Sequence, residues 1–229
     1  MDRLTGVAEL LDGSLDDPIA LRANLRDLRR INRLTGGTDL SIRAIAALGE
    51  ATTILDVGTG GADIPTALLA RAAREARPLR VTAVDSRPEV LAAARVIRPA
   101  IERTDGLDLA VADGRGLPYP DAAFDVAHAS LVVHHLDADD AIALLRELRR
   151  VARRGVVVND LVRSRLAWLG AVIVVQTVAR SRYTRHDGPL SVRRAYTEPE
   201  LLELVRAAGL DPVASARGFA GHRIAIAAR

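Results

Sequence analysis

A short apolar run followed by closely spaced glycines constrains this chain more than any other feature. The stretch 53–63 reads Thr-Ile-Leu-Asp-Val-Gly-Thr-Gly-Gly-Ala-Asp, and apolar residues at helical spacing follow it. A strand, a tight loop and a helix are therefore expected in that order. Glycine at Gly58, Gly60 and Gly61 permits a left-handed backbone and lets the main chain approach a ligand. The stretch predicts a site for a nucleotide-like ligand, although an ordinary turn between strand and helix is also compatible with it.

Two carboxylates beside this loop narrow the choice of ligand. A dinucleotide fingerprint that starts at Gly58 and Gly60 would have its third glycine at position 63, where this chain has Asp63. A carboxylate at a helix N-terminus repels a pyrophosphate, and Asp56 adds a second acid at the end of the strand. The loop therefore favours a cationic ligand without phosphate, such as S-adenosylmethionine, over a nicotinamide dinucleotide.

Strand and helix patterns alternate through the middle of the chain. Further strands are expected at 81–85, 107–112, 124–129 and 156–158. Helices are expected between the strands: the first ends near Arg77, the second passes through Ile97 and the third covers 138–150 and should be stopped by Gly155. Such alternation is typical of a parallel, doubly wound sheet. Ligands bind beyond the carboxyl ends of its strands, where Asp56, Asp85 and Asp113 are expected to lie. These three acids therefore predict a ligand site at that edge.

The first 50 residues show no strand pattern. Apolar residues repeat at helical spacing in three segments, 4–11, 21–31 and 42–48, and Asp17-Pro18 provides an N-cap and a first-turn proline. This helical extension could be a packing appendage or a lid over the glycine loop.

The last third of the chain also departs from simple alternation. The apolar run 166–179 is too short for a membrane span. It predicts a buried helix, a wall of an apolar substrate pocket or a dimer face. The basic segment 180–194 is expected to turn at 186–189. A hairpin of strands 212–217 and 222–228 then closes the chain and should place an antiparallel strand at the sheet's edge.

Composition limits the classes of function. The chain has no cysteine, which excludes disulfides, cysteine nucleophiles and thiolate metal sites. All basic residues are arginine, but the net charge is only +3 and aromatic residues make up 3%. Because stacking platforms are missing, no nucleic-acid partner is expected. Arginine residues are dense in 146–194. They could form a solvated face, or they could attract a phenolate, an acidic partner or, weakly, an anionic membrane surface. No signal-peptide or transmembrane pattern is present, so a cytoplasmic location is the expectation.

The motifs, taken in order, resemble those of class I S-adenosylmethionine-dependent methyltransferases of the ubiquinone and menaquinone biosynthesis type. They are the glycine loop, Asp85, Asp113-Gly114 and the run 117–126, and the resemblance covers about residues 30–160. Segments 28–37 and 186–197 are also similar to O-methyltransferases found beside type III polyketide synthases.

The resemblance implies an α/β fold with a doubly wound, seven-stranded, mostly parallel sheet and a C-terminal antiparallel hairpin. It implies an N-terminal helical lid in residues 1–50. A Rossmann-like methyltransferase domain would occupy 51–229, with an acceptor-side insertion at about 161–196.

The resemblance also implies a cofactor site for S-adenosylmethionine. Its expected residues are Arg43, Asp56, Gly58, Thr59, Gly60, Gly61, Asp85, Ser86, Ala112, Asp113, Gly114, Ala129 and Ser130. Asp56 would orient the loop and the ammonium group, Asp85 would hold the ribose hydroxyls and Asp113 the adenine amino group. No metal is required for displacement at a sulfonium carbon, and no metal ligands are predicted.

Three histidines are candidates for a general base. The run Val-His-His-Leu-Asp resembles the segment that carries the base of plant phenol O-methyltransferases, with His134 at the matching position and His135 beside it. An imidazole can take a phenolic proton near neutral pH. His186, beside Asp187, is the candidate on the acceptor side, whereas His128 and His222 are expected to be structural.

The predicted function is methyl transfer to a small-molecule acceptor, at a hydroxyl of an apolar phenolic or quinol compound of polyketide or quinone type. The alternatives are a nicotinamide-dependent oxidoreductase and a non-catalytic binding protein on the same fold. A monomer or homodimer is expected.

Overall fold

A seven-stranded sheet forms the centre of the computed structural model, which describes all residues from 1 to 229. Its order is β3-β2-β1-β4-β5-β7-β6. The strands are β1 (Thr53–Val57), β2 (Arg80–Asp85), β3 (Leu107–Val111), β4 (Phe124–Ser130), β5 (Ala152–Leu161), β6 (Pro212–Arg217) and β7 (Arg223–Ala228). Strands β1 to β5 pair in parallel, and β7 is antiparallel to both of its neighbours. The predicted fold class is confirmed.

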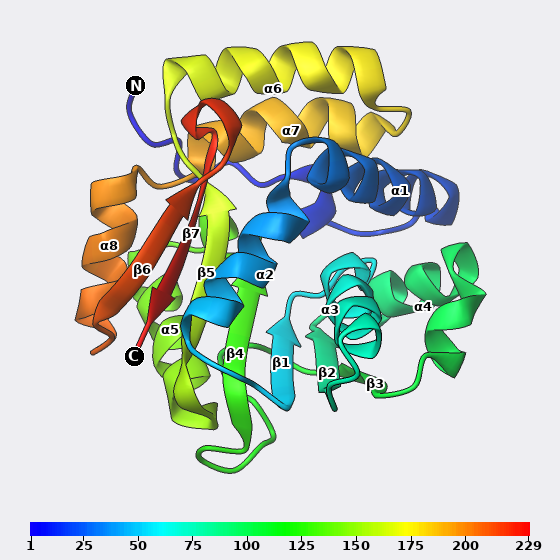
Figure 1. Ribbon diagram of the computed structural model, residues 1–229. Coiled ribbons are helices and arrows are strands. Elements are labelled where there is room, and N and C mark those ends of the chain that lie inside the picture. The colour runs from blue at the N-terminus through cyan, green and yellow to red at the C-terminus, as the bar shows by residue number, and fades with distance from the viewer.

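Helices cover both faces of the sheet and its upper edge (Figure 1). They are α1 (Pro18–Leu34), α2 (Gly37–Ala47), α3 (Asp63–Arg74), α4 (Pro88–Ile97), α5 (Ala138–Val151), α6 (Arg165–Val178), α7 (Arg182–Arg194) and α8 (Glu198–Ala207). Short 3-10 turns lie at Leu10–Asp12 (η1), Pro99–Arg103 (η2), Val133–His135 (η3) and Phe219–Gly221 (η4). Helices α1, α6 and α7 lie beyond the carboxyl ends of the parallel strands (Figure 1). None of the helices has the length and apolar character needed to span a bilayer.

Alternating side chains of the strands divide the core between two layers. Ile54 and Val157 pack with α2 and α3, whereas Leu55 and Val156 pack with α5 and α8 on the opposite face. Because consecutive strand residues point to opposite faces, apolar residues in succession are needed where both faces are covered. This explains why the strands read as continuous apolar runs in the sequence.

Side-chain contacts cap helices α1 and α8 and confirm the predicted cap at Asp17. Asp17 caps α1 by accepting hydrogen bonds from the amides of Ile19 and Ala20. Thr197 and Glu200 form the capping box that starts α8. These caps satisfy amides that have no partner within the helix.

The predicted helix in residues 4–11 is wrong. Residues 4–9 form no helix, and only the 3-10 turn η1 remains of the first expected helix, because this segment binds other parts of the chain through its backbone and Arg3. At the other end of the chain the predicted hairpin is confirmed, because β6 pairs antiparallel with β7 and lies at the edge of the sheet, while β7 lies between β5 and β6.

Two predicted breaks are absent. Gly155 does not stop a helix but lies within β5, where a Cβ would come 2.4 Å from the carbonyl oxygen of Ala228. The turn expected at 186–189 is part of α7, although Pro189 lies inside it. A Cβ at Gly188 would meet Val175 of α6 at 2.6 Å, so close packing of the two helices outweighs the low helix propensity of this segment.

Candidate active site

The glycine loop leaves β1 and runs close to neighbouring segments. Gly58 and Gly60 have positive φ angles of 69° and 54°, which glycine adopts without strain. A Cβ at Gly58 would lie 2.4 Å from a methyl group of Val132. Leu25 of α1 packs over Gly60 and Gly61. The predicted extension therefore lies directly beside the predicted cofactor loop.

Asp85 lies at the end of β2 and faces this loop. Its carboxylate accepts hydrogen bonds from the amides of Gly60 (3.0 Å) and Arg87 (3.1 Å). Burial raises the pKa of Asp85, and these two hydrogen bonds only partly offset it. Each carboxylate oxygen keeps a free lone pair, as a hydroxyl-binding acid requires.

Asp113 occupies a different environment from Asp85. It follows β3, is exposed and pairs with Arg115 at 3.1 Å. Hydrogen bonds from Arg115 hold the pKa of Asp113 below its usual range. A ligand at this end would therefore meet a solvated ion pair rather than a buried acid.

Asp56 belongs to a buried polar chain below the loop. Its Oδ1 lies 2.5 Å from Nδ1 of His128, and Nε2 of His128 lies 2.8 Å from the Ser41 hydroxyl. Asn159 donates to the same hydroxyl at 2.7 Å. His128 is packed, as expected, and it is the partner of Asp56 within the protein.

The other predicted cofactor residues fall into two groups. Thr59, Ala112, Gly114 and Ala129 are buried and Ser130 is half-buried at the strand ends, and the Thr59 hydroxyl is buried without a hydrogen-bond partner. Arg43 and Ser86 are exposed. The sequence thus brings most of the predicted set to one edge of the sheet.

A cavity of about 430 Å³ lies beyond this edge, between α1, α6, α7 and η4. Of its 28 lining residues, 15 are hydrophobic. Many belong to α6, including Leu166, Leu169 and Val174. This agrees with the interpretation of the run 166–179 as a wall of an apolar pocket, while Trp168 of the same helix does not line the cavity and is exposed.

His134 lies in the wall of this cavity and pairs with an acid at the end of β5. Its Nδ1 is 2.6 Å from Oδ1 of Asp160, which is 2% exposed. Although burial raises the pKa of Asp160, its interactions with His134, Leu161 and Arg223 lower it overall. Asp160 is therefore an anion that orients the imidazole and leaves Nε2 available.

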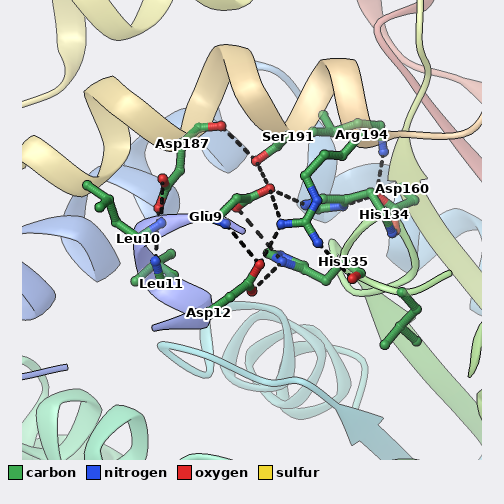
Figure 2. A network of polar contacts seen from close by, with 12 residues as sticks. Glu9, Leu10, Leu11, Asp12, His134, His135, Asp160, Asp187, Ser191 and Arg194 are labelled. Carbon is green, nitrogen blue, oxygen red and sulfur yellow. Dashed lines mark hydrogen bonds and ion pairs between the residues drawn. The ribbon is translucent and has the colours of Figure 1, made fainter. Parts of the chain in front are cut away.

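A second set of polar residues meets His134 from the N-terminal segment and α7 (Figure 2). Oε1 of Glu9 lies 3.9 Å from His134 Nε2 and accepts a hydrogen bond from Ser191 at 2.9 Å. Burial raises the pKa of Glu9 to about 6, although the neighbouring His135 and Arg194 act to lower it. Glu9 therefore changes charge in the range where enzymes usually work.

His135 joins the same set from the outer side (Figure 2). Its Nδ1 is 2.9 Å from Asp12, whose pKa lies well below its usual range because His135 and Arg194 outweigh the effect of burial. Ligand atoms of Glu9, His134 and His135 lie within 4.8 Å of one another and could hold a metal ion. Arg194 already supplies positive charge there, 3.7 Å from Glu9.

The third candidate base is separated from the cavity. His186 is largely exposed on α7 and bonds to Asp187 at 2.7 Å, and it does not line the cavity. Asp187 itself accepts hydrogen bonds from the amides of Leu10 and Leu11 (Figure 2). His222 lines the cavity and binds the Phe219 carbonyl at 2.6 Å.

Comparisons with known proteins agree with the fold of this chain. Residues 55–158 match the family of methyltransferase domains. A S-adenosylmethionine-dependent methyltransferase from Aquifex aeolicus has a similar structure, with a TM-score of 0.64 and 19% identity over 93% of this chain and 97% of that one. The mitomycin 7-O-methyltransferase MmcR has a TM-score of 0.68 and 21% sequence identity, and the match covers 97% of this chain and 60% of MmcR. An O-methyltransferase family 2 protein from Planctomyces limnophilus, in complex with apigenin, has a TM-score of 0.62 and 18% sequence identity. The match covers 94% of this chain and 63% of that protein.

The chain therefore spans about three fifths of the length of the last two proteins. No curated protein matches the sequence. The domain match and the shared fold bear out the predicted cofactor, S-adenosylmethionine, and methyl transfer as the class of reaction. They disfavour the nicotinamide alternative.

Sequence reasoning missed four residues of the site: Glu9, Asp160, Arg194 and Arg223. Asp160 could have been found, because it lies just after the apolar run 156–158, much as Asp85 comes after the apolar residues of the strand expected at 81–85. The others carry no local signal, since they reach the site through contacts with distant segments.

Proposed function

We propose that this protein transfers the methyl group of S-adenosylmethionine to a hydroxyl of an apolar phenolic or quinol acceptor, with His134 as general base. The observation that carries this proposal is the pair of His134 and Asp160 in the wall of a mainly apolar cavity. Small molecules bind in such cavities, oriented by a few polar groups.

The residues at the sheet edge fit the cofactor. Asp85 can accept from two ribose hydroxyls, the positive-φ glycines allow a close approach of the backbone, and the buried Thr59 hydroxyl has no partner within the protein. When bound, S-adenosylmethionine supplies an electrophilic methyl carbon on a sulfonium. In this proposal the glycine loop, Ala129 and Ser130 hold that end, and residues 1–50 form the lid.

His134 would act on the acceptor hydroxyl. Asp160 accepts the Nδ1 proton, so Nε2 is the nitrogen that receives a proton from the acceptor. As that proton moves, the acceptor oxygen gains the electron density needed to attack carbon. The anionic Asp160 then stabilises the imidazolium, and the ionised form of Glu9 lies 3.9 Å from the same ring.

The nature of the cavity supports an apolar aromatic acceptor. Its walls from α6 contain leucine, isoleucine, valine and alanine side chains, and its polar groups gather near His134. Two of the structurally similar proteins are O-methyltransferases, which supports oxygen as the methylated atom. The resemblance of 186–197 to methyltransferases beside polyketide synthases supports a long-chain phenol of secondary metabolism.

The test compares His134→Ala with His186→Ala on a long-chain resorcinol across pH. A phenol with a pKa near 10 is neutral at pH 7, so His134→Ala should lower the rate there by about 10²–10⁴-fold. Part of the rate should return at high pH, where the phenolate forms unaided. His186→Ala, outside the cavity, should keep its rate. Full activity of His134→Ala at pH 7 would show that this histidine is no base.

A further inference from the structure

Arg223 is a buried cation without an acidic partner. It is 2% exposed, and its guanidinium donates to Oδ1 of Asn32 at 2.7 Å and to the Ser130 hydroxyl at 3.1 Å. Its Nε is buried and has no hydrogen-bond partner. Two other buried arginines differ, since Arg163 pairs with Glu200 at 2.7 Å and Arg194 pairs with Asp12.

The charge of Arg223 is balanced only at longer range. Asp160 and Asp63 act on it electrostatically, but neither forms an ion pair with it. Burial lowers the pKa of Arg223 to about 10, so the guanidinium stays charged at neutral pH. An unpaired buried charge is costly for a folded protein. Ionisable groups whose pKa is strongly shifted by burial cluster at functional sites.

The surroundings of Arg223 are shaped to hold this side chain. A Cβ at Gly37 would lie 1.9 Å from a guanidinium nitrogen, so only glycine leaves room at the start of α2. Asn32 accepts from Arg223 and donates to Asp63 at 3.2 Å. The Asn32 amide thus links the Arg223 guanidinium to the Asp63 carboxyl group. This arrangement suits a ligand that carries a negative and a positive group close together.

Arg223 also faces both parts of the candidate site. It lines the same cavity as His134, and its partner Ser130 ends β4 beside the predicted methyl position. A planar guanidinium matches a carboxylate through paired N–H donors.

We propose that Arg223 is the receptor for a carboxylate of a bound small molecule. Two ligands could bring that carboxylate. One is the amino-acid end of S-adenosylmethionine, which rests on the proposed function and would place its ammonium group toward Asp63. The other is an acceptor that bears a carboxylate next to its phenol.

The test measures binding to wild type and Arg223→Met by calorimetry, with S-adenosylhomocysteine and with 5′-methylthioadenosine, which lacks the amino-acid end. If the cofactor brings the carboxylate, Arg223→Met should lose about a hundredfold in affinity for S-adenosylhomocysteine and keep its affinity for methylthioadenosine. Arg223→Lys should lose less. If the acceptor brings it, both nucleosides should bind Arg223→Met as before, while KM rises at least about tenfold for a carboxylated phenol but not for its methyl ester.

Arg163→Met is the matched control, since it removes a buried arginine that is paired and lies outside the cavity. It should lower the melting temperature and leave both nucleosides bound as in wild type. Arg223→Met should leave the melting temperature unchanged or raise it. Equal loss of both nucleosides with a lower melting temperature, or no change in any ligand, would overturn the proposal. Failure of wild type to bind either nucleoside would instead overturn the proposed function, and the cofactor source with it.

Discussion

The proposed cofactor edge, which is the glycine loop with Asp85 and Asp113, and the proposed acceptor cavity, which His134 and α6 line, lie side by side but are built in different ways. At the edge, polar groups come from residues that end strands or follow them, and backbone amides hold them, as Gly60 and Arg87 hold Asp85. In the cavity, polar groups come from segments far apart in the chain and hold one another through side chains, as Ser191 holds Glu9. The edge is thus fixed by the sheet, whereas the cavity depends on the N-terminal segment and on α6 and α7. Substitutions should therefore separate cofactor binding from catalysis.

The largest effect that should be confined to the edge is that of Asp85→Ala. If Asp85 holds two ribose hydroxyls, each bond to the charged group contributes about 1.5–3 kcal/mol, so affinity for S-adenosylhomocysteine should fall by about a hundredfold or more. Calorimetry measures this, with Asp113→Ala as comparison, because the exposed Asp113 should matter less. Affinity within twofold of wild type for Asp85→Ala would place the ribose elsewhere.

Asp160→Asn should affect only the cavity. It keeps the size of the side chain but removes the negative charge that orients and stabilises the His134 ring, so kcat at pH 7 should fall by about tenfold or more. Cofactor affinity should be unchanged. Asp125→Asn is the control, because Asp125 is another buried acid, bound to Thr52 and Thr53 away from the cavity. An unchanged kcat and pH profile for Asp160→Asn would remove the pair from the mechanism.

The third expected effect is on stability rather than on affinity or rate. The pKa of Glu9 is raised by burial to about 6 from its ordinary value of 4.5, so the folded chain keeps a proton that the unfolded chain loses. The contribution of Glu9 to the free energy of unfolding should therefore fall by about 2 kcal/mol as pH rises from below 4.5 to above 6. Urea denaturation of wild type and Glu9→Gln below pH 4.5 and above pH 6 measures this change. The free energy of unfolding of Glu9→Gln should not show the fall that is due to Glu9. A Glu9→Gln profile parallel to that of wild type would mean that Glu9 is not a buried acid in solution.

The same contrast explains what the sequence could predict. The order of strands and helices, the caps of α1 and α8 and the position of Asp85 follow from local patterns, because each depends on neighbours in the chain. Asp160 was accessible by the same logic. Glu9 and Arg223 were not, because Glu9 meets Ser191 of α7 and Arg223 meets Asn32 of α1 only after the chain has folded. The prediction of a turn in α7 failed for a related reason, since packing against α6 outweighs local propensity there.

The central claim is that cofactor edge and cavity together move a methyl group to an oxygen. The most direct measurement incubates the protein with S-adenosylmethionine labelled in its methyl group and a panel of long-chain phenols and quinols, and identifies the labelled atom by mass spectrometry and NMR. The account predicts an O-methyl product that depends on His134. A label on carbon or nitrogen, or no transfer to any hydroxylated acceptor, would contradict it.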